Sequence, residues 1–251
     1  MKNRCSALQV ANDVTLYHVG PALDHGPLPS LFYFAISGPD SLCLDPYNQI
    51  VQFLAGHMIR IFSMTLPGHE NGLPAEGAMK IWAEDFLKGR NCIETFLQTL
   101  DQAIDFAIRE KFVDPTKLAC AGLSRGGFIA SHLAARDTRF RYLLFFSPLT
   151  KLSAIKEFKG HPNLALASQL DVIHLADSIS DRHIRLYIGN DDTRVGTRHF
   201  FDYAMKIVEK KKTRSAHVEL VIYPSIGQMG HGTPPEIFSL GADWIRTLLL
   251  Q

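Results

Sequence analysis

The sequence has little excess charge, few cysteines and no long apolar run. It contains 26 Lys and Arg residues against 25 Asp and Glu residues, a formal net charge of +1, so it lacks the broad basic field with which proteins bind nucleic acids. Its four cysteines form no CxxC pair, which argues against a zinc ribbon or a redox motif. No apolar run approaches the ~20 residues of a membrane span, and the N-terminus has no apolar segment of signal-peptide length. We therefore expect a soluble, cytoplasmic protein with neither a membrane span nor a nucleic-acid partner.

The 251 residues have an ordinary globular composition, with 46% hydrophobic and 20% charged residues. Neither a collagen-like nor a disordered chain has this balance. We find no internal repeat, linker or break in composition, so a single domain over residues 1–251 is the simplest prediction.

Apolar runs alternate with amphipathic stretches from about residue 30 onward, which predicts a mostly parallel sheet covered by helices on both faces. An antiparallel edge is expected at Val14–Val19, and Ser37–Asp40 is predicted to be a turn. The segment 147–182 is irregular, with a helix expected around 163–174. The remaining predicted strands are 31–36, 58–64, 117–121, 142–146, 184–188 and 218–223, and the remaining predicted helices are 46–55, 75–87, 92–111, 124–135, 197–211 and 235–250.

The strongest chemical signal is Gly122-Leu123-Ser124-Arg125-Gly126-Gly127, which matches G-x-S-x-G between a predicted strand and a predicted helix. A tight turn there would hold the Ser124 hydroxyl clear of the sheet, and bulky residues at 122 or 126 would collide across it. The amide of Arg125, at a helix N-terminus, would then face a developing oxyanion. The alternative is a plain glycine-rich turn in which Ser124 caps the helix.

A serine nucleophile needs a base, and the base needs an orienting carboxylate. His231 follows the last predicted strand in a glycine-rich loop, at the sheet edge where ligands bind in such folds. His69 also follows a strand, but we interpret it as a rim residue. Asp191 and Asp192 both follow the strand 184–188, and the order Ser…Asp…His is that of one specific fold.

With these motifs the chain resembles the α/β-hydrolase superfamily from about residue 30 to its end. It is most similar to small serine esterases of the prolyl-oligopeptidase-like (S9-like) and dienelactone-hydrolase-like groups. The resemblance implies an α/β-hydrolase fold with a small cap at about 147–182. It also favours Asp192 over Asp191, since Gly189, Asp192 and Val195 fall in register with the acidic motif G-x-x-D-x-x-V.

One turn departs from the family pattern. Many members carry His-Gly where this chain has Ser37-Gly38-Pro39-Asp40, and a backbone N–H there completes the oxyanion hole. Pro39 has no N–H, so Asp40 or Ser41 is expected to supply the second donor beside Arg125.

The prediction is a serine hydrolase, a carboxylesterase or thioesterase, that acts on a small-molecule ester without metal or cofactor. Ser124 would attack, His231 would carry the proton and Asp192 would orient His231. Arg125 and Arg194 flank the site in sequence, where they would either favour acidic acyl groups or serve as solvated rim charges. The alternatives are a non-catalytic binding module with this fold, or a small peptidase or acyltransferase. The oligomeric state is not readable from the sequence.

Overall fold

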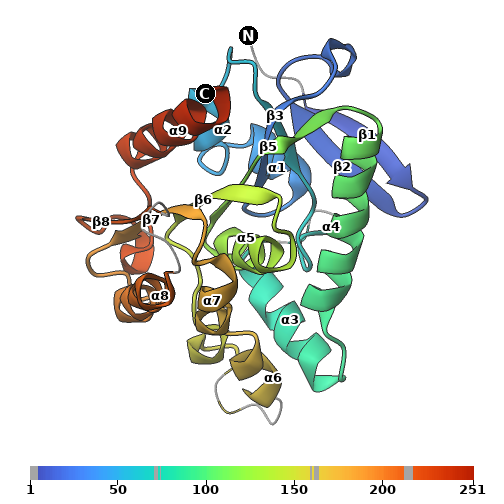
Figure 1. Cartoon of the computed structure of the whole chain (residues 1–251). Coiled ribbons are helices and arrows are strands. Elements are labelled where there is room, and N and C mark those ends of the chain that lie inside the picture. The colour runs from blue at the N-terminus through green and yellow to red at the C-terminus, as the bar shows by residue number, and fades with distance from the viewer. Residues whose placement is uncertain (1–4, 71–72, 74, 159, 161–163, 212–216) are drawn as a thin grey trace.

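The computed structural model describes residues 5–70, 73, 75–158, 160, 164–211 and 217–251 (Figure 1). Within them, eight strands form a sheet in the order β1-β2-β4-β3-β5-β6-β7-β8. Strand β2 pairs antiparallel with β1 and β4, and the other neighbouring pairs are parallel, which confirms the predicted antiparallel edge. The strands are β1 (Ser6–Ala11), β2 (Val14–Val19), β3 (Leu28–Phe34), β4 (Arg60–Ser63), β5 (Val113–Leu123), β6 (Phe140–Phe146), β7 (His183–Gly189) and β8 (Val218–Tyr223).

Helices cover both faces of this sheet (Figure 1). Because strand side chains alternate, Phe32 and Phe34 of β3 belong to the apolar cluster that includes residues of α3, α4, α5, α7 and α8. Leu31 and Tyr33 belong to the cluster on the other face, which includes residues of α1, α2 and α9. The helices are α1 (Gly38–Cys43), α2 (Gln49–Phe53), α3 (Ala78–Leu87), α4 (Cys92–Arg109), α5 (Arg125–Arg136), α6 (Leu164–Gln169), α7 (Ala176–Ile179), α8 (Thr197–Lys210) and α9 (Pro235–Leu250).

The prediction of a turn at Ser37–Asp40 is wrong, because this segment begins helix α1. The Ser37 side chain caps the helix by accepting the N–H of Asp40 at 3.2 Å, and Pro39 occupies the first turn, where a missing N–H costs no helix hydrogen bond. The following helix, expected over 46–55, is limited to α2.

The predicted cap segment carries the short helices α6 and α7 with a 3₁₀ turn, Val172–Leu175, between them. The prediction of one helix over 163–174 is therefore wrong, and its first residue, Asn163, lies outside the described residues. That the whole chain forms one domain with a small cap stays a prediction. In the part of the chain that the structure describes, no helix is long and apolar enough to cross a membrane.

Candidate active site

Ser124 lies in the tight connection between β5 and α5, with backbone angles of φ 55° and ψ −118°. Its N–H donates to the carbonyl of Phe146 at 2.9 Å, and its own carbonyl accepts the N–H of Leu149 at 2.9 Å. The positive φ, which non-glycine residues rarely adopt, is thus held by the adjacent strand β6 and the segment after it.

Two glycines make this connection possible by their lack of a side chain. A Cβ on Gly122 would lie 2.2 Å from the carbonyl carbon of Gly126, and a Cβ on Gly126 would lie 1.9 Å from the carbonyl oxygen of Phe34. Both contacts are with backbone, which cannot move aside as a flexible side chain can. The collision predicted from the sequence motif is confirmed at both positions.

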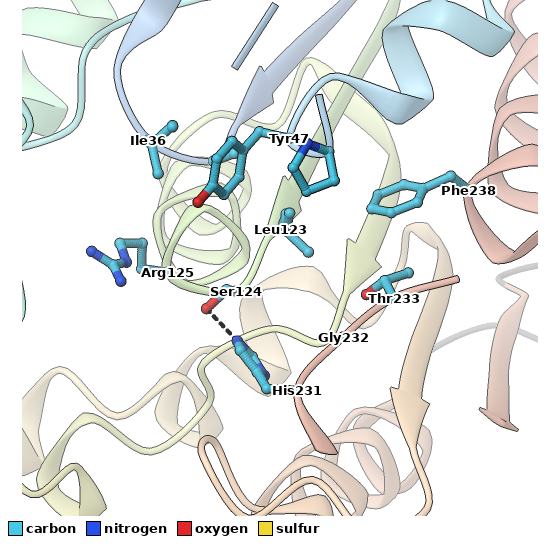
Figure 2. Close-up of a pocket in the computed structure, with 11 residues that line it drawn as sticks. Ile36, Tyr47, Leu123, Ser124, Arg125, His231, Gly232, Thr233 and Phe238 are labelled. Carbon is cyan, nitrogen blue, oxygen red and sulfur yellow. Dashed lines mark hydrogen bonds between the residues drawn. The ribbon is translucent and has the colours of Figure 1, made fainter. Parts of the chain in front are cut away.

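His231 reaches Ser124 from the loop between β8 and α9. Its Nε2 lies 2.8 Å from the Ser124 Oγ (Figure 2). Met229 and Gly230 just before it have positive φ values of 56° and 70°. A Cβ on Gly230 would meet the carbonyl oxygen of Asp191 at 2.1 Å, so this turn packs closely against the loop that follows β7.

Asp192, in that second loop, contacts the other ring nitrogen of His231. Its Oδ2 lies 2.6 Å from His231 Nδ1, and its Oδ1 accepts the backbone N–H groups of Arg194 and Val195, each at 3.0 Å. Because a carboxylate only accepts, Nδ1 carries a proton toward Asp192 and the Nε2 lone pair faces the Ser124 hydroxyl. The structure brings Ser124, His231 and Asp192 together. It leaves the side chain of Asp191 exposed.

The predicted oxyanion donors divide into two groups. Arg125 is the first residue of α5, directly after Ser124. Asp40 and Ser41, however, donate their N–H groups to the side chain and carbonyl of Ser37, at 3.2 Å and 2.9 Å. These amides cap α1 and neither residue lines the cavity over Ser124. The expectation that one of them supplies the second donor is therefore not supported, because their hydrogens are already engaged.

A cavity of about 250 Å³ opens over Ser124 and His231 (Figure 2). Its walls are mainly apolar, as is common for small-ligand sites. The residues that line it are Ala35, Ile36, Pro46, Tyr47, Leu123, Ser124, Arg125, His231, Gly232, Thr233 and Phe238. Among the described residues, no group of three or more His, Cys, Asp and Glu side chains is placed to hold a metal ion.

His69 differs from its sequence interpretation as a rim residue. It is buried, with 4% of its surface exposed, and its Nε2 lies 3.1 Å from Nη1 of Arg125. The sequence indicated that His69 follows a strand, but it gave no sign of a contact with the residue after Ser124. The cavity walls supplied by Tyr47 and Phe238 also had no signal in the sequence.

The amino-acid sequence matches the model of a known protein family. Residues 82–236, more than half of the chain, match the prolyl oligopeptidase family. The chain belongs to the prolyl oligopeptidase family. This is a family of serine hydrolases, and the matched segment contains Ser124, Asp192 and His231.

Individual relatives are distant. Acylamino-acid-releasing enzyme 2 of Oryza sativa subsp. japonica is 22% identical over 210 residues, which are 74% of this chain and 26% of that protein. The chain thus spans about a quarter of the length of this curated relative.

Solved structures share the α/β-hydrolase fold over nearly the whole chain. The protein TT1662 from Thermus thermophilus has a TM-score of 0.74 at 16% identity and covers 100% of both chains. A cold-adapted esterase from an Arctic intertidal metagenomic library has a TM-score of 0.67 at 20% identity, over 98% of this chain and 93% of that one. The predicted α/β-hydrolase fold is therefore confirmed.

Proposed function

We propose that this member of the prolyl oligopeptidase family hydrolyses carboxylic esters or thioesters through an acyl-enzyme intermediate. The observation that carries the proposal is the unbroken hydrogen-bond chain from Asp192 through His231 to Ser124, at 2.6 Å and 2.8 Å, which ends in a cavity. A serine held against an oriented imidazole is the arrangement that activates a hydroxyl for acyl transfer.

In the proposed mechanism Ser124 Oγ attacks the substrate carbonyl while His231 Nε2 takes its proton. Asp192 stabilises the imidazolium and fixes its tautomer. The carbonyl oxygen becomes an anion, for which the N–H of Arg125 at the start of α5 is one donor. We propose the backbone N–H of Ser37 as the second, since Ser37 follows Ile36, which lines the cavity but donates its own N–H to Ser41 Oγ at 3.0 Å. His231 then protonates the leaving alcohol or thiol, and water, activated by His231, releases the acid.

Turnover of p-nitrophenyl acetate and p-nitrophenyl butyrate by wild type and Ser124→Ala tests the proposal. We expect the variant to lose nearly all activity, because no other residue replaces the nucleophile. Equal rates in the two proteins would exclude Ser124 as the nucleophile. A fluorophosphonate probe should label wild type at Ser124; failure to label folded protein would favour a non-catalytic binding module instead.

Peptide-bond hydrolysis is the second candidate, because the curated relative is named an acylamino-acid-releasing enzyme. Comparing kcat/KM for p-nitrophenyl butyrate with that for an N-acetyl amino acid p-nitroanilide separates the two candidates. We expect the ester to be strongly preferred, since its leaving group needs less help to depart. A preference for the anilide would overturn the ester assignment while keeping the serine mechanism.

A further inference from the structure

Arg125 contributes more to the candidate site than its backbone amide. Arg125 is one of the residues that line the cavity, and its side chain extends beside Ser124 (Figure 2). Its Nη1 lies 3.1 Å from Nε2 of His69, which comes from the loop after β4. The guanidinium is therefore held by a residue more than fifty positions away in the sequence, and it belongs to a residue of the cavity wall.

His69 directs this guanidinium without neutralising it. Burial, and then the charge of Arg125, lower the pKa of His69 to about 4, so the imidazole is uncharged at neutral pH and its Nε2 accepts the hydrogen bond. Burial lowers the pKa of Arg125 to about 10, with Arg194 as the next contributor. Arg125 thus remains a cation at neutral pH.

The rest of the cavity wall is mainly apolar, in contrast to the charged side chain of Arg125. Among the described residues that line it, Arg125 is the one that carries a permanent charge. The nearby Arg194 pairs with Glu157, at 3.3 Å, and does not line the cavity. In Figure 2 the side chains of Arg125 and Phe238 lie on opposite sides of Ser124. One end of the site is therefore cationic and the other apolar.

We propose that Arg125 binds a carboxylate that the substrate carries a few atoms from the carbonyl attacked by Ser124, while an apolar part of the substrate packs toward Phe238. The planar guanidinium fork matches a carboxylate in shape and charge. This substrate class rests on the proposed ester hydrolysis, because it concerns the same site.

Matched ester pairs test the proposal with Arg125→Gln and Arg125→Lys. One pair places the carboxylate on the acyl side, p-nitrophenyl hemiglutarate against p-nitrophenyl pentanoate. The other places it on the leaving side, the butyryl ester of 4-hydroxybenzoate against phenyl butyrate. In at least one pair, Arg125→Gln should lower the ratio of kcat/KM for the anionic over the neutral ester by about 10–100-fold, the range of charged hydrogen bonds. Arg125→Lys should retain part of the preference.

Arg198→Gln is the control, since it removes the same charge from an exposed position on α8, and it should leave both ratios within about twofold of wild type. Turnover of all esters with ratios unchanged in Arg125→Gln would overturn the carboxylate site and leave the proposed function intact. Absence of any turnover in wild type would instead refute the proposed function.

A binding measurement tests the carboxylate site independently of ester turnover. In the Ser124→Ala background, which needs no turnover, the Kd for each of the two anionic esters is measured by calorimetry with and without Arg125→Gln. We expect the affinity for at least one of them to fall about tenfold or more when the charge is removed. Unchanged affinities for both esters would overturn the proposal whatever the activity of the enzyme.

Discussion

The hydroxyl of Tyr223 lies 2.8 Å from Oγ of Ser147, and this contact ties together two loops that converge on the candidate site. The same hydroxyl lies 3.1 Å from Oγ1 of Thr233 and 3.3 Å from the carbonyl of Gly232, the residue after His231. Ser147, which follows β6, has a positive φ of 41° and is fully buried. Three hydroxyls thus connect the histidine loop to the segment that holds Ser124.

Removal of the Tyr223 hydroxyl should loosen His231. We expect Tyr223→Phe to lower kcat about three- to tenfold with little change in KM, because the loop loses an anchor while the cavity keeps its walls. Stability should fall by about 1 kcal/mol, the net value of a buried hydrogen bond. Tyr142→Phe on β6 is the control. If kcat fell no more than in the control, Tyr223 would have no positioning role.

The carboxylate of Asp192 should be required for a fast chemical step. Asp192→Asn keeps the size of the side chain but can present an amide N–H to His231, which would favour the wrong tautomer. We expect kcat to fall about 10³–10⁴-fold with a small effect on KM, as in other triads. Asp191→Asn, at the exposed neighbour, should stay near wild type. A larger loss in Asp191→Asn than in Asp192→Asn would reverse the assignment.

A side chain at residue 126 should disrupt the turn at Ser124. Because a Cβ on Gly126 would lie 1.9 Å from the carbonyl oxygen of Phe34, Gly126→Ala must displace β3 or α5. We expect a loss of about 1–3 kcal/mol in the free energy of unfolding, measured by urea denaturation, together with loss of ester turnover. Gly77→Ala is the matched control, since a Cβ there has no atom within 4 Å. Equal stabilities of the two variants would contradict the close packing.

Stability should fall in mild acid because of His132 on α5. Burial lowers the pKa of this histidine to about 4, its Nε2 donates to the carbonyl of Leu170 at 3.0 Å, and its ring packs on Phe128. Below pH 6.5 the unfolded chain therefore binds the proton before the folded chain does, so stability decreases as the pH falls from about 6.5 to about 4. The size of this effect is on the order of 3 kcal/mol.

His132→Gln separates this contribution from that of other titrating groups, since glutamine can still donate to Leu170 but does not titrate. Urea unfolding of both proteins at several pH values between 7.5 and 4 gives the difference in unfolding free energy. We expect wild type to lose its advantage over the variant as the pH falls. A difference that is independent of pH would show that His132 titrates normally.

The sequence predicted the convergence of Ser124, Asp192 and His231 because each follows a strand of one parallel sheet, and such strands end at the same edge. Periodicity also located helix α9 and strand β8 at their observed bounds. These features follow from local patterns and from one topological rule, so they need no knowledge of side-chain packing.

Contacts between distant loops were not predictable in this way. The pairing of His69 with Arg125 depends on how the loop after β4 packs against α5, and no periodic signal encodes it. At Ser37–Pro39, turn and helix-start signals coincide, since serine and proline are common in both. The choice was decided by Ser37, whose side chain caps α1. Its Oγ and its backbone carbonyl accept the two amides expected at the oxyanion site.

The backbone angles of Ser124 have a consequence for the timing of catalysis. Strand β6 and the glycines around Ser124 hold its φ at 55°, and His231 Nε2 lies 2.8 Å from its Oγ, so contacts within the fold itself place the hydroxyl beside its base. The backbone freedom of this residue is given up once, when the chain folds, so the cost of its unusual backbone angles is part of folding and not of each reaction cycle.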